Sequence, residues 1–338
     1  MFVAGWSFTN QCNLKCRHCY NASGKKHLDE LTNEQAKEVA RKLIDFKVDA
    51  VNFGGGECPL RDDFFEISEM LYNAGIKLSL TTNGLEYQRT MPHLHLFHDI
   101  GVSIDFADEQ KHDYLRGKEG AYKSAIDAVK YYVSKGVDTE IVSCITKLNS
   151  SDEELRKMYD LAISLDVNYW RLNRYRPTGR KGDIDLLKLE PSDLMRAYSF
   201  LEKQIDKDFT IPDPLFNIFG KKSAPCPCGR TSFRIQPNGE VSPCVFLKLN
   251  GGNILDKSIE EILDSDIFRQ IRNRDLSGTK CDSCNLAEKC KGGCAGAAYI
   301  ENGTFNAPDP LCWHEPDWNV HEKYLCTAYV PIKGRKRC

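Results

Sequence analysis

The stretch VAGWSFTNQCNLKCRHC covers residues 3–19 and places three cysteines directly after a run of strand-forming residues. β-branched and aromatic side chains in Val3–Thr9 predict a strand. Cys12, Cys16 and Cys19 follow with the spacing C-x3-C-x2-C. Three thiolates on one loop can hold three irons of a cubane cluster and leave the fourth iron without a protein ligand. This order of strand and loop predicts an active site at the carboxyl end of the strand.

Composition sets the broad class of the protein. The chain has 338 residues, which predicts about two domains, and its net charge of −2 argues against a nucleic-acid or anionic-lipid partner. No apolar run reaches the roughly 18 residues of a membrane span, and the first residues do not resemble a signal peptide. Its 15 cysteines are too few for a small disulfide scaffold and too many for an ordinary cytosolic enzyme. We expect a cytoplasmic, metal-rich protein without a membrane or nucleic-acid partner.

Hydrophobic periodicity predicts alternating strands and helices over the first two thirds of the chain. Helical patterns cover Thr32–Phe46, with Thr32 or Asn33 as the N-cap, and Ser151–Leu165, with Ser150 or Ser151 as the N-cap. A third helical pattern covers Asp62–Ala74. Such alternation predicts an α/β fold with a parallel sheet, here a partial (β/α)6 TIM-like barrel, with a flat doubly wound sheet as the alternative. The predicted strands are Val3–Thr9, Ala50–Phe53, Lys77–Thr81, Ile100–Ile104, Thr139–Ile145 and Asn168–Leu172.

Cysteine density and proline positions predict the domain boundaries. A helix is expected over Pro191–Lys207, and the following Phe209–Pro225 contains three prolines. Eight cysteines lie between Cys226 and Cys312. We therefore expect a barrel over residues 1–208, a linker over 209–225, a small cysteine-rich domain over 226–316 and a C-terminal tail over 317–338.

The three-cysteine motif resembles that of the radical S-adenosylmethionine (SAM) superfamily, whose signature is C-x3-C-x-φ-C. Here it reads Cys12-Asn-Leu-Lys-Cys16-Arg-His18-Cys19. Gly55, Gly56 and Glu57 end the second predicted strand and resemble the family motif that receives the amino group of SAM. Glycines allow close approach of the backbone, and a carboxylate pairs with an ammonium group. Cys58 stands where the family usually has proline. Zinc bound by the three cysteines with His18 or a distant residue is the alternative.

Three weaker motifs extend the resemblance along the barrel. They are Thr82-Asn83-Gly84, Ser103-Ile104-Asp105 and His112-Asp113-x-x-Arg116-Gly117. Read on their own, they are a turn, a strand end with an N-cap and a surface loop. The resemblance implies SAM contacts from Asn83, Ser103, Asp105 and Arg116, the last through the SAM carboxylate. It also implies reductive cleavage of SAM to a 5′-deoxyadenosyl radical that abstracts hydrogen.

The C-terminal cysteines resemble those of the SPASM domain, the auxiliary-cluster extension of peptide-modifying radical SAM proteins. The tight run reads Cys281-x2-Cys284-x5-Cys290-x3-Cys294, with Cys312 after a gap and Gly239-x4-Cys244 upstream. The resemblance implies two auxiliary [4Fe-4S] clusters, and so three in all. One would be bound by Cys226, Cys244 and Cys294, and the other by Cys281, Cys284, Cys290 and Cys312.

The first auxiliary ligand has two candidates. Cys226 and Cys228 both satisfy the spacing to Gly239, and Cys226 is favoured because Cys226-Pro-Cys228-Gly-Arg230 resembles the family's C-x-x-G-R start. Cys228 would then complete the first auxiliary cluster, or the fourth iron stays open for substrate. A zinc knuckle that binds RNA through the tight run is the alternative, although it leaves the three-cysteine loop unexplained.

The isolated cysteines and the arginines near the sixth predicted strand are most simply explained by structural roles. Isolated cysteines are mostly small buried hydrophobic residues, which we expect for Cys144, while Cys58 beside Glu57 is also a candidate to face SAM. The remaining two, Cys326 and Cys338, fit no cluster spacing. Arginines around the sixth strand favour solvated charge, with the lining of an opening for a carboxylate-bearing substrate as the alternative: Arg171, Arg174, Arg176 and Arg180.

The resemblance implies an enzyme, a radical SAM maturase of ribosomally synthesised peptides. It would crosslink, epimerise or excise part of a precursor peptide, and no residue is singled out as the general base or hydrogen donor. A flavodoxin- or ferredoxin-type electron donor is implied as well. Because the motif starts at residue 12, we expect leader recognition by a separate protein. Modification of porphyrin side chains in haem-variant biosynthesis is the second enzymatic reading, and a non-catalytic zinc-binding RNA or protein interaction module is the reading from another class.

Overall fold

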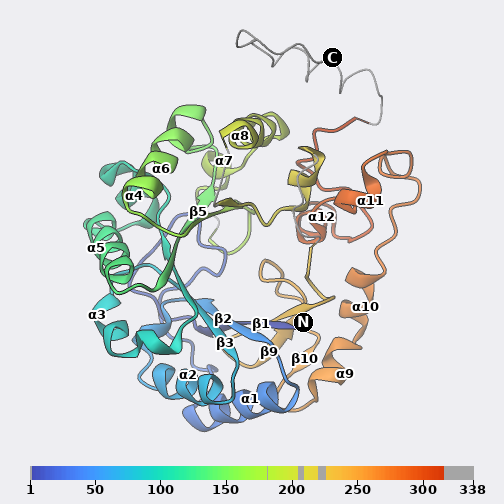
Figure 1. Ribbon diagram of the computed structural model, residues 1–338. Coiled ribbons are helices and arrows are strands. Elements are labelled where there is room, and N and C mark those ends of the chain that lie inside the picture. The colour runs from blue at the N-terminus through green and yellow to red at the C-terminus, as the bar shows by residue number, and fades with distance from the viewer. Residues whose placement is uncertain (1, 181, 205–208, 220–225, 316–338) are drawn as a thin grey trace.

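A ten-stranded sheet organises the described residues of the computed structural model, which are 2–180, 182–204, 209–219 and 226–315. Its strand order is β10-β9-β8-β1-β2-β3-β4-β5-β6-β7. All neighbours from β8 to β7 pair in parallel, while β9 and β10 pair antiparallel. Figure 1 shows the helices around the outside of the curved sheet. The strands are β1 (Val3–Thr9), β2 (Ala50–Gly55), β3 (Lys77–Thr82), β4 (Asp99–Ser103), β5 (Asp138–Ile145), β6 (Tyr169–Arg174), β7 (Phe209–Thr210), β8 (Ser232–Ile235), β9 (Glu240–Ser242) and β10 (Gly252–Asn253).

Helices follow most of the barrel strands, and two of them begin at N-caps that the sequence predicts. Thr32 caps the first helix in a capping box with Gln35, and Ser151 accepts from the backbone of Glu154 at the start of α6. The barrel helices are α1 (Asn33–Asp45), α2 (Phe64–Asn73), α3 (Tyr87–Thr90), α4 (Glu109–Arg116), α5 (Ala121–Ser134), α6 (Asp152–Ser164), α7 (Ile184–Leu187) and α8 (Pro191–Gln204). The C-terminal helices are α9 (Ile259–Leu263), α10 (Asp266–Arg272), α11 (Ala287–Cys290) and α12 (Ala295–Asn302). Short 3-10 helices cover Cys58–Leu60, Met91–Leu96 and Pro214–Phe219.

The sequential strand order confirms the partial barrel. A doubly wound sheet reverses its strand order at one point, whereas β1 to β7 follow one another without reversal. The sheet does not close, because β7 and β10 form its two edges. The sheet also extends beyond the six predicted strands, since β7 adds to one side and β8 joins β1 on the other. Two-residue strands such as β7 leave no periodicity for sequence reasoning to detect.

Residues 209–219, within the predicted linker, are folded onto the barrel. β7 pairs with β6, and the following 3-10 helix buries Leu215, Phe216 and Ile218. The three prolines marked this segment as a linker, and Pro214 opens the buried turn within it. Residues 220–225 and the predicted tail, including Cys326 and Cys338, lie outside the described residues. Within the described residues, no helix combines the length and hydrophobicity that crossing a membrane requires.

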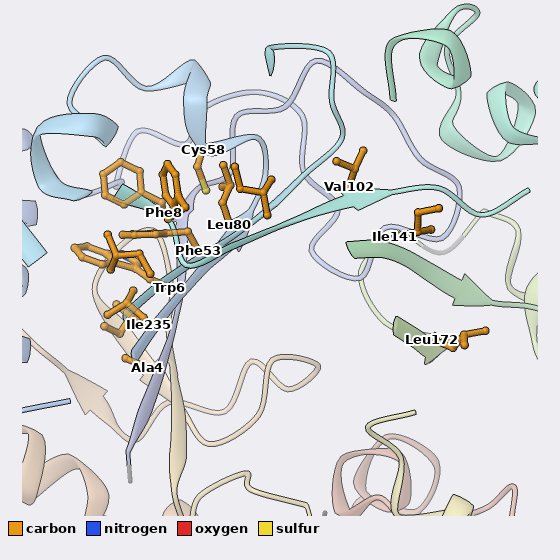
Figure 2. Packing of buried hydrophobic residues seen from close by; sticks show 14 of the residues in the cluster. Ala4, Trp6, Phe8, Phe53, Cys58, Leu80, Val102, Ile141, Leu172 and Ile235 are labelled. Carbon is orange, nitrogen blue, oxygen red and sulfur yellow. The ribbon is translucent and has the colours of Figure 1, made fainter. Parts of the chain in front are cut away.

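Aromatic side chains fill the core between β1, β2 and α2. Trp6 and Phe8 are buried, and Phe8 packs edge-on against Phe53 and Phe64 with ring centroids 5.8 and 5.3 Å apart. Figure 2 shows Trp6, Phe8 and Phe53 on one side of the sheet, with Cys58 among them. The Cys58 thiol donates to the Gly54 carbonyl oxygen at 3.3 Å and has no exposed surface. Cys58 is therefore a core residue, and the candidate role of facing SAM is not supported.

Candidate active site and cysteine clusters

The three-cysteine loop begins against the carboxyl end of β2. The backbone amide of Gly56 donates to the Thr9 carbonyl at 2.7 Å, and that of Glu57 donates to the Gln11 carbonyl at 2.8 Å. A Cβ atom at Gly56 would lie 2.1 Å from the Gln11 oxygen, a distance that no side chain can accept. The glycine is therefore required for contact between β2 and the chain just before Cys12. The sequence predicted a close approach of this backbone to a ligand, whereas in the structure the approach is to the loop.

The same loop contacts the carboxyl end of α4. Arg17 donates its backbone N–H to the Leu115 carbonyl at 2.9 Å. Gly117 ends α4 with φ of +70°, and a Cβ there would lie 2.6 Å from the Lys15 carbonyl oxygen. Lys15 immediately precedes Cys16. The backbone of α4 thus fixes the middle of the loop.

We expect Gly117→Ala to disturb the loop more than its conformational strain alone explains. Gly120 offers a matched control, because its φ is +78° but nothing lies within 4 Å of its added Cβ. Gly120→Ala should cost about 1–2 kcal/mol of unfolding free energy for the left-handed backbone. Gly117→Ala should cost about 1–3 kcal/mol more because of the contact with Lys15, and should lower the iron bound per chain. Urea denaturation and iron assays measure both effects, and equal effects of the two variants would contradict this role of Gly117.

The segment after β6 holds the loop from a third side. The Arg180 backbone amide donates to the Cys19 carbonyl at 2.9 Å. Its guanidinium donates to the carbonyls of Cys16 at 2.9 Å and Ser23 at 2.8 Å. Arg180 is thus a clamp on the loop backbone, which contradicts its interpretation as solvated charge.

Glu57 lies buried at the carboxyl ends of β2 and β3. It is 1% exposed, the Thr82 hydroxyl donates to its Oε1, and the Asn83 amide donates to Oε2 at 3.0 Å. Burial raises the pKa of Glu57 to about 7, against the opposing effect of these two hydrogen bonds. A cationic group beside the carboxylate would favour its ionised form. Asn83 also donates to Asn13 at 2.8 Å and lies 3.9 Å from Cys12 Sγ.

Asp105 anchors a second buried group beside the loop. Its Oδ2 lies 2.8 Å from Arg116 Nη2 and 3.6 Å from His18 Nε2, and its Oδ1 accepts from the Cys144 amide at 2.8 Å. Arg116 Nη1 lies 3.9 Å from Cys16 Sγ. Arg116, which was predicted to bind the carboxylate of SAM, is therefore already paired with the carboxylate of Asp105. Among the described residues, Arg116 Nε and His18 Nδ1 are buried without a hydrogen-bond partner, as expected of groups that await a ligand.

The thiols of the loop share an apolar surrounding. Cys12, Cys16 and Cys19 pack in one cluster with Leu14 and Ala121. Burial raises the pKa of Cys12 to about 12 and also raises that of Cys16, which Arg116 opposes. Iron binding therefore has to displace protons from these thiols. All three are free thiols on one anchored loop, so the residues present fit a cluster with three protein ligands.

A second group of thiols gathers around α12 and β9. Cys228 packs against the apolar cluster that contains Cys244, and the neighbouring thiols of Cys226 and Cys244 both raise its pKa. A Cβ at Gly296 would lie 3.1 Å from Cys244 Sγ and 3.8 Å from Cys294 Sγ. The structure thus brings together the cysteines of the first predicted auxiliary cluster, with Cys228 among them.

The third group surrounds the short helix α11. Cys281, Cys284 and Cys290 influence one another electrostatically, and Cys312 is close enough to Cys290 for the same effect. Burial raises the pKa of Cys312 to about 11. These are the four cysteines of the second predicted auxiliary cluster, and the fold gathers residues from both sides of α12.

The arrangement of donors bears on the zinc alternatives. Among the described residues, no group of three or more His, Cys, Asp or Glu side chains converges as the ligands of a single metal ion do. Zinc requires such convergence, since its ligands surround one ion. A cubane does not, because each thiolate binds a different iron.

Two arginines at the end of β6 join the barrel to the C-terminal domain. Arg174 has no exposed side-chain surface, and it pairs with Asp213 at 2.6 Å and with both oxygens of Asp309. Arg176 is 7% exposed and lies against Cys294. Solvated charge was the wrong interpretation for both. Their partners were missed, because Asp213 and Asp309 lie 39 and 135 residues beyond Arg174 and no local pattern connects them.

The remaining predicted residues have simpler places. Ser103 is half-buried as the last residue of β4. Cys144 is half-buried near the end of β5 and packs beside Phe106 and Tyr175. Arg171 pairs with Glu140 at 2.9 Å, so it is not an unpaired partner for a substrate carboxylate.

Two family models match the chain. The model of the radical SAM superfamily matches residues 6–162, and SPASM, an iron–sulfur cluster-binding domain, matches residues 226–291. The first match runs from within β1 to within α6 and includes the three-cysteine loop. The second begins at Cys226 and includes β8 to α11.

Curated relatives and solved structures align with most of the chain. Mycofactocin maturase MftC of Mycolicibacterium smegmatis is 32% identical, with 92% of this chain and 83% of the relative covered. The AdoMet-dependent heme synthase of Methanosarcina barkeri is 28% identical, with 93% and 97% covered. The fold is similar to that of Streptococcus suis SuiB, solved with S-adenosylmethionine and, separately, with its precursor peptide SuiA. Both SuiB structures give a TM-score of 0.76, at 20% and 19% identity, with 93% of this chain covered in each case and 77% and 76% of SuiB.

Proposed function

Because this chain belongs to the radical SAM superfamily and carries a SPASM domain, we propose that it is an enzyme that cleaves SAM reductively and modifies a ribosomally synthesised peptide. The observation that carries this proposal is the anchored loop with Cys12, Cys16 and Cys19. Three strand ends, those of β2, β3 and β4, bring Glu57, Asn83 and Asp105 next to it. This is the edge of the sheet at which active sites of β/α barrels lie.

The residues around the loop have separate tasks in this proposal. When bound, the cluster and SAM supply a 5′-deoxyadenosyl radical, formed by one-electron reduction and homolysis of the C–S bond. Glu57 would hold the amino group of SAM, because its buried carboxylate is oriented by Thr82 and Asn83. Arg116 and His18 would use their free nitrogens to bind and orient the remaining polar groups. The aromatic core behind β1 and β2 keeps these positions rigid.

Gly55, Gly56 and Ser103 complete the proposed SAM site. The glycines place the carboxyl end of β2 against the loop, and Ser103 ends the neighbouring strand β4. None of these residues exchanges a proton in the proposed reaction, and their contribution is position. A general base and a hydrogen donor are not assigned.

We propose three [4Fe-4S] clusters, one held by each of the three groups of cysteines. The first auxiliary cluster would take Cys226, Cys228, Cys244 and Cys294, and the proximity of Cys228 to Cys226 and Cys244 supports its inclusion. The second would take Cys281, Cys284, Cys290 and Cys312. Free thiols in this number favour a reducing compartment, and we propose a cytoplasmic location.

Porphyrin modification is the second candidate function. Its support is the similarity to the heme synthase of Methanosarcina barkeri over 97% of that protein. The arginines that would suit propionate groups are engaged elsewhere: Arg171 with Glu140, Arg174 with two aspartates, Arg176 with Cys294 and Arg180 with the loop. The peptide reading is favoured, since MftC shares the higher identity and the SuiB structure contains a precursor peptide.

Other partners follow from the reaction. Each SAM cleavage consumes one electron, for which we propose a flavodoxin- or ferredoxin-type donor. A separate protein that binds the leader of the precursor is also part of the proposal. Its contribution is tested by whether added leader-binding protein accelerates modification.

Mass spectrometry of candidate substrates tests the function. The reconstituted enzyme is incubated anaerobically with SAM, dithionite and either a candidate precursor peptide or a propionate-bearing porphyrin. We expect a mass change in the peptide, with one 5′-deoxyadenosine per event, and none in the porphyrin. Conversion of the porphyrin alone would establish the second candidate instead.

A further inference from the structure

Arg176 directs two of its donors at one sulfur atom. Its Nε and Nη2 lie 3.3 and 3.2 Å from Cys294 Sγ, and Nη1 donates to the Arg174 carbonyl at 3.2 Å. A planar guanidinium can present two parallel N–H groups to one acceptor, which an ammonium cannot. The guanidinium comes from the barrel, and the sulfur from the C-terminal domain.

The charge of Arg176 is shielded from water. The side chain is 7% exposed, and the ring of Phe246 covers the guanidinium at 4.3 Å. Its nearest carboxylate, Asp213, lies 3.7 Å away and already pairs with Arg174 at 2.6 Å. Asp213 therefore neutralises mainly Arg174. The positive charge of Arg176 lies beside Cys294 where water is largely excluded, so its effect on the sulfur is only weakly screened.

The backbone of Cys294 is linked to the end of β6 through Asp309. Asp309 accepts the Cys294 amide hydrogen at 2.8 Å, and Asp309 is itself paired with Arg174. Arg174, the last residue of β6, thus acts on the Cys294 amide, while Arg176, two residues beyond the strand, contacts the sulfur. The contact between Arg176 and the sulfur is set by the packing of the two domains rather than by a mobile side chain.

We propose that Arg176 is a positioning residue that raises the reduction potential of the auxiliary cluster bound by Cys294. The inference rests on the proposed function, because it takes Cys294 to be a ligand. Reduction adds one electron from an external low-potential donor, and no proton moves or bond breaks. The added negative charge is stabilised by the buried guanidinium and by the two N–H···S hydrogen bonds, which strengthen as electron density on sulfur grows. The oxidised cluster gains less from both, so reduction is favoured.

Redox titration monitored by electron paramagnetic resonance (EPR) tests the proposal in the full-length, reconstituted protein. The signal that changes on addition of SAM belongs to the cluster of the three-cysteine loop, and the other signals belong to the auxiliary clusters. Arg176→Gln removes the positive charge. Arg176→Lys keeps the charge but removes the pair of N–H groups that the guanidinium directs at Cys294 Sγ. Arg171→Gln is the matched control, since Arg171 lies on β6, five residues before Arg176, and pairs with Glu140 rather than with a sulfur.

Arg176→Gln should lower the midpoint potential of one auxiliary cluster by at least about 59 mV. For one electron this corresponds to a tenfold change in the reduction equilibrium. Arg176→Lys should give a smaller shift of the same sign, and the other auxiliary potential and both potentials of Arg171→Gln should stay at the wild-type values. An unchanged potential in either Arg176 variant with its full iron content, or an equal shift in Arg171→Gln, would overturn the proposal. Wild-type formation of 5′-deoxyadenosine in the same preparation shows separately whether the proposed function holds.

Discussion

The triple variant Cys12→Ala, Cys16→Ala, Cys19→Ala is expected to form no 5′-deoxyadenosine above background. The loop supplies the only proposed ligands of the SAM-binding cluster, so the variant lacks the iron to which SAM would bind. The auxiliary cysteines lie in two other groups, between Cys226 and Cys312. Iron should therefore fall from about twelve to about eight atoms per chain rather than to zero. Iron assays and chromatography of the anaerobic reaction measure the two quantities.

A matched control is Cys58→Ala. Cys58 directly follows Glu57 of the proposed SAM site, but it lies in the apolar core and its thiol donates to the Gly54 carbonyl. This variant should keep about twelve irons and near-wild-type formation of 5′-deoxyadenosine, at a modest cost in stability. Wild-type activity in the triple variant would remove the loop from the mechanism.

Glu57→Gln is expected to weaken SAM binding by roughly ten- to a hundredfold. Loss of a charge-assisted hydrogen bond costs about 1.5–3 kcal/mol, which corresponds to that change in Kd. The amide has nearly the same shape, yet its NH2 group would face the Thr82 hydroxyl or the Asn83 amide, both of which donate to Glu57. The cluster should still assemble, because Glu57 bonds to no cysteine. Equilibrium dialysis with labelled SAM measures Kd, and iron assays check the cluster.

Glu154→Gln provides the comparison for Glu57. Glu154 is also a buried carboxylate, at 6% exposure, but it pairs with Lys111 at 2.7 Å at the start of α6. Its substitution should leave the Kd for SAM within about twofold of wild type, as for sites that share no partners. If Glu57→Gln binds SAM as tightly as Glu154→Gln does, Glu57 is not the partner of the amino group.

Much of the barrel could be predicted because its signals are local. Val3–Thr9 is found as a strand with the predicted bounds, and Thr32 and Ser151 cap their helices as the capping residues indicate. Each of these signals lies within a few residues of the feature it specifies. The division of the C-terminal cysteines into two groups was instead implied by the resemblance to the SPASM domain.

The missing parts depend on residues distant in sequence. Arg174 and Arg176 lie at a strand end, where charge is usually solvated, and only the folded chain brings Asp213, Asp309 and Cys294 to them. The addition of β8 to the barrel sheet has the same origin, since its partner β1 lies more than 200 residues earlier. The role of Gly117 also depends on tertiary contact, because the collision that it avoids is with Lys15.

One measurement addresses the loop chemistry most directly. Wild-type protein, reconstituted with iron and sulfide under anaerobic conditions, is mixed with SAM and dithionite, and both nucleoside and amino acid products are quantified. Homolysis of one C–S bond predicts 5′-deoxyadenosine and methionine in equal amounts, released only when the reductant is present. A preparation with its full iron content that yields neither product, or that releases methionine without the nucleoside, would contradict the claim. The cluster at Cys12, Cys16 and Cys19 would then not have a fourth iron that binds and cleaves SAM.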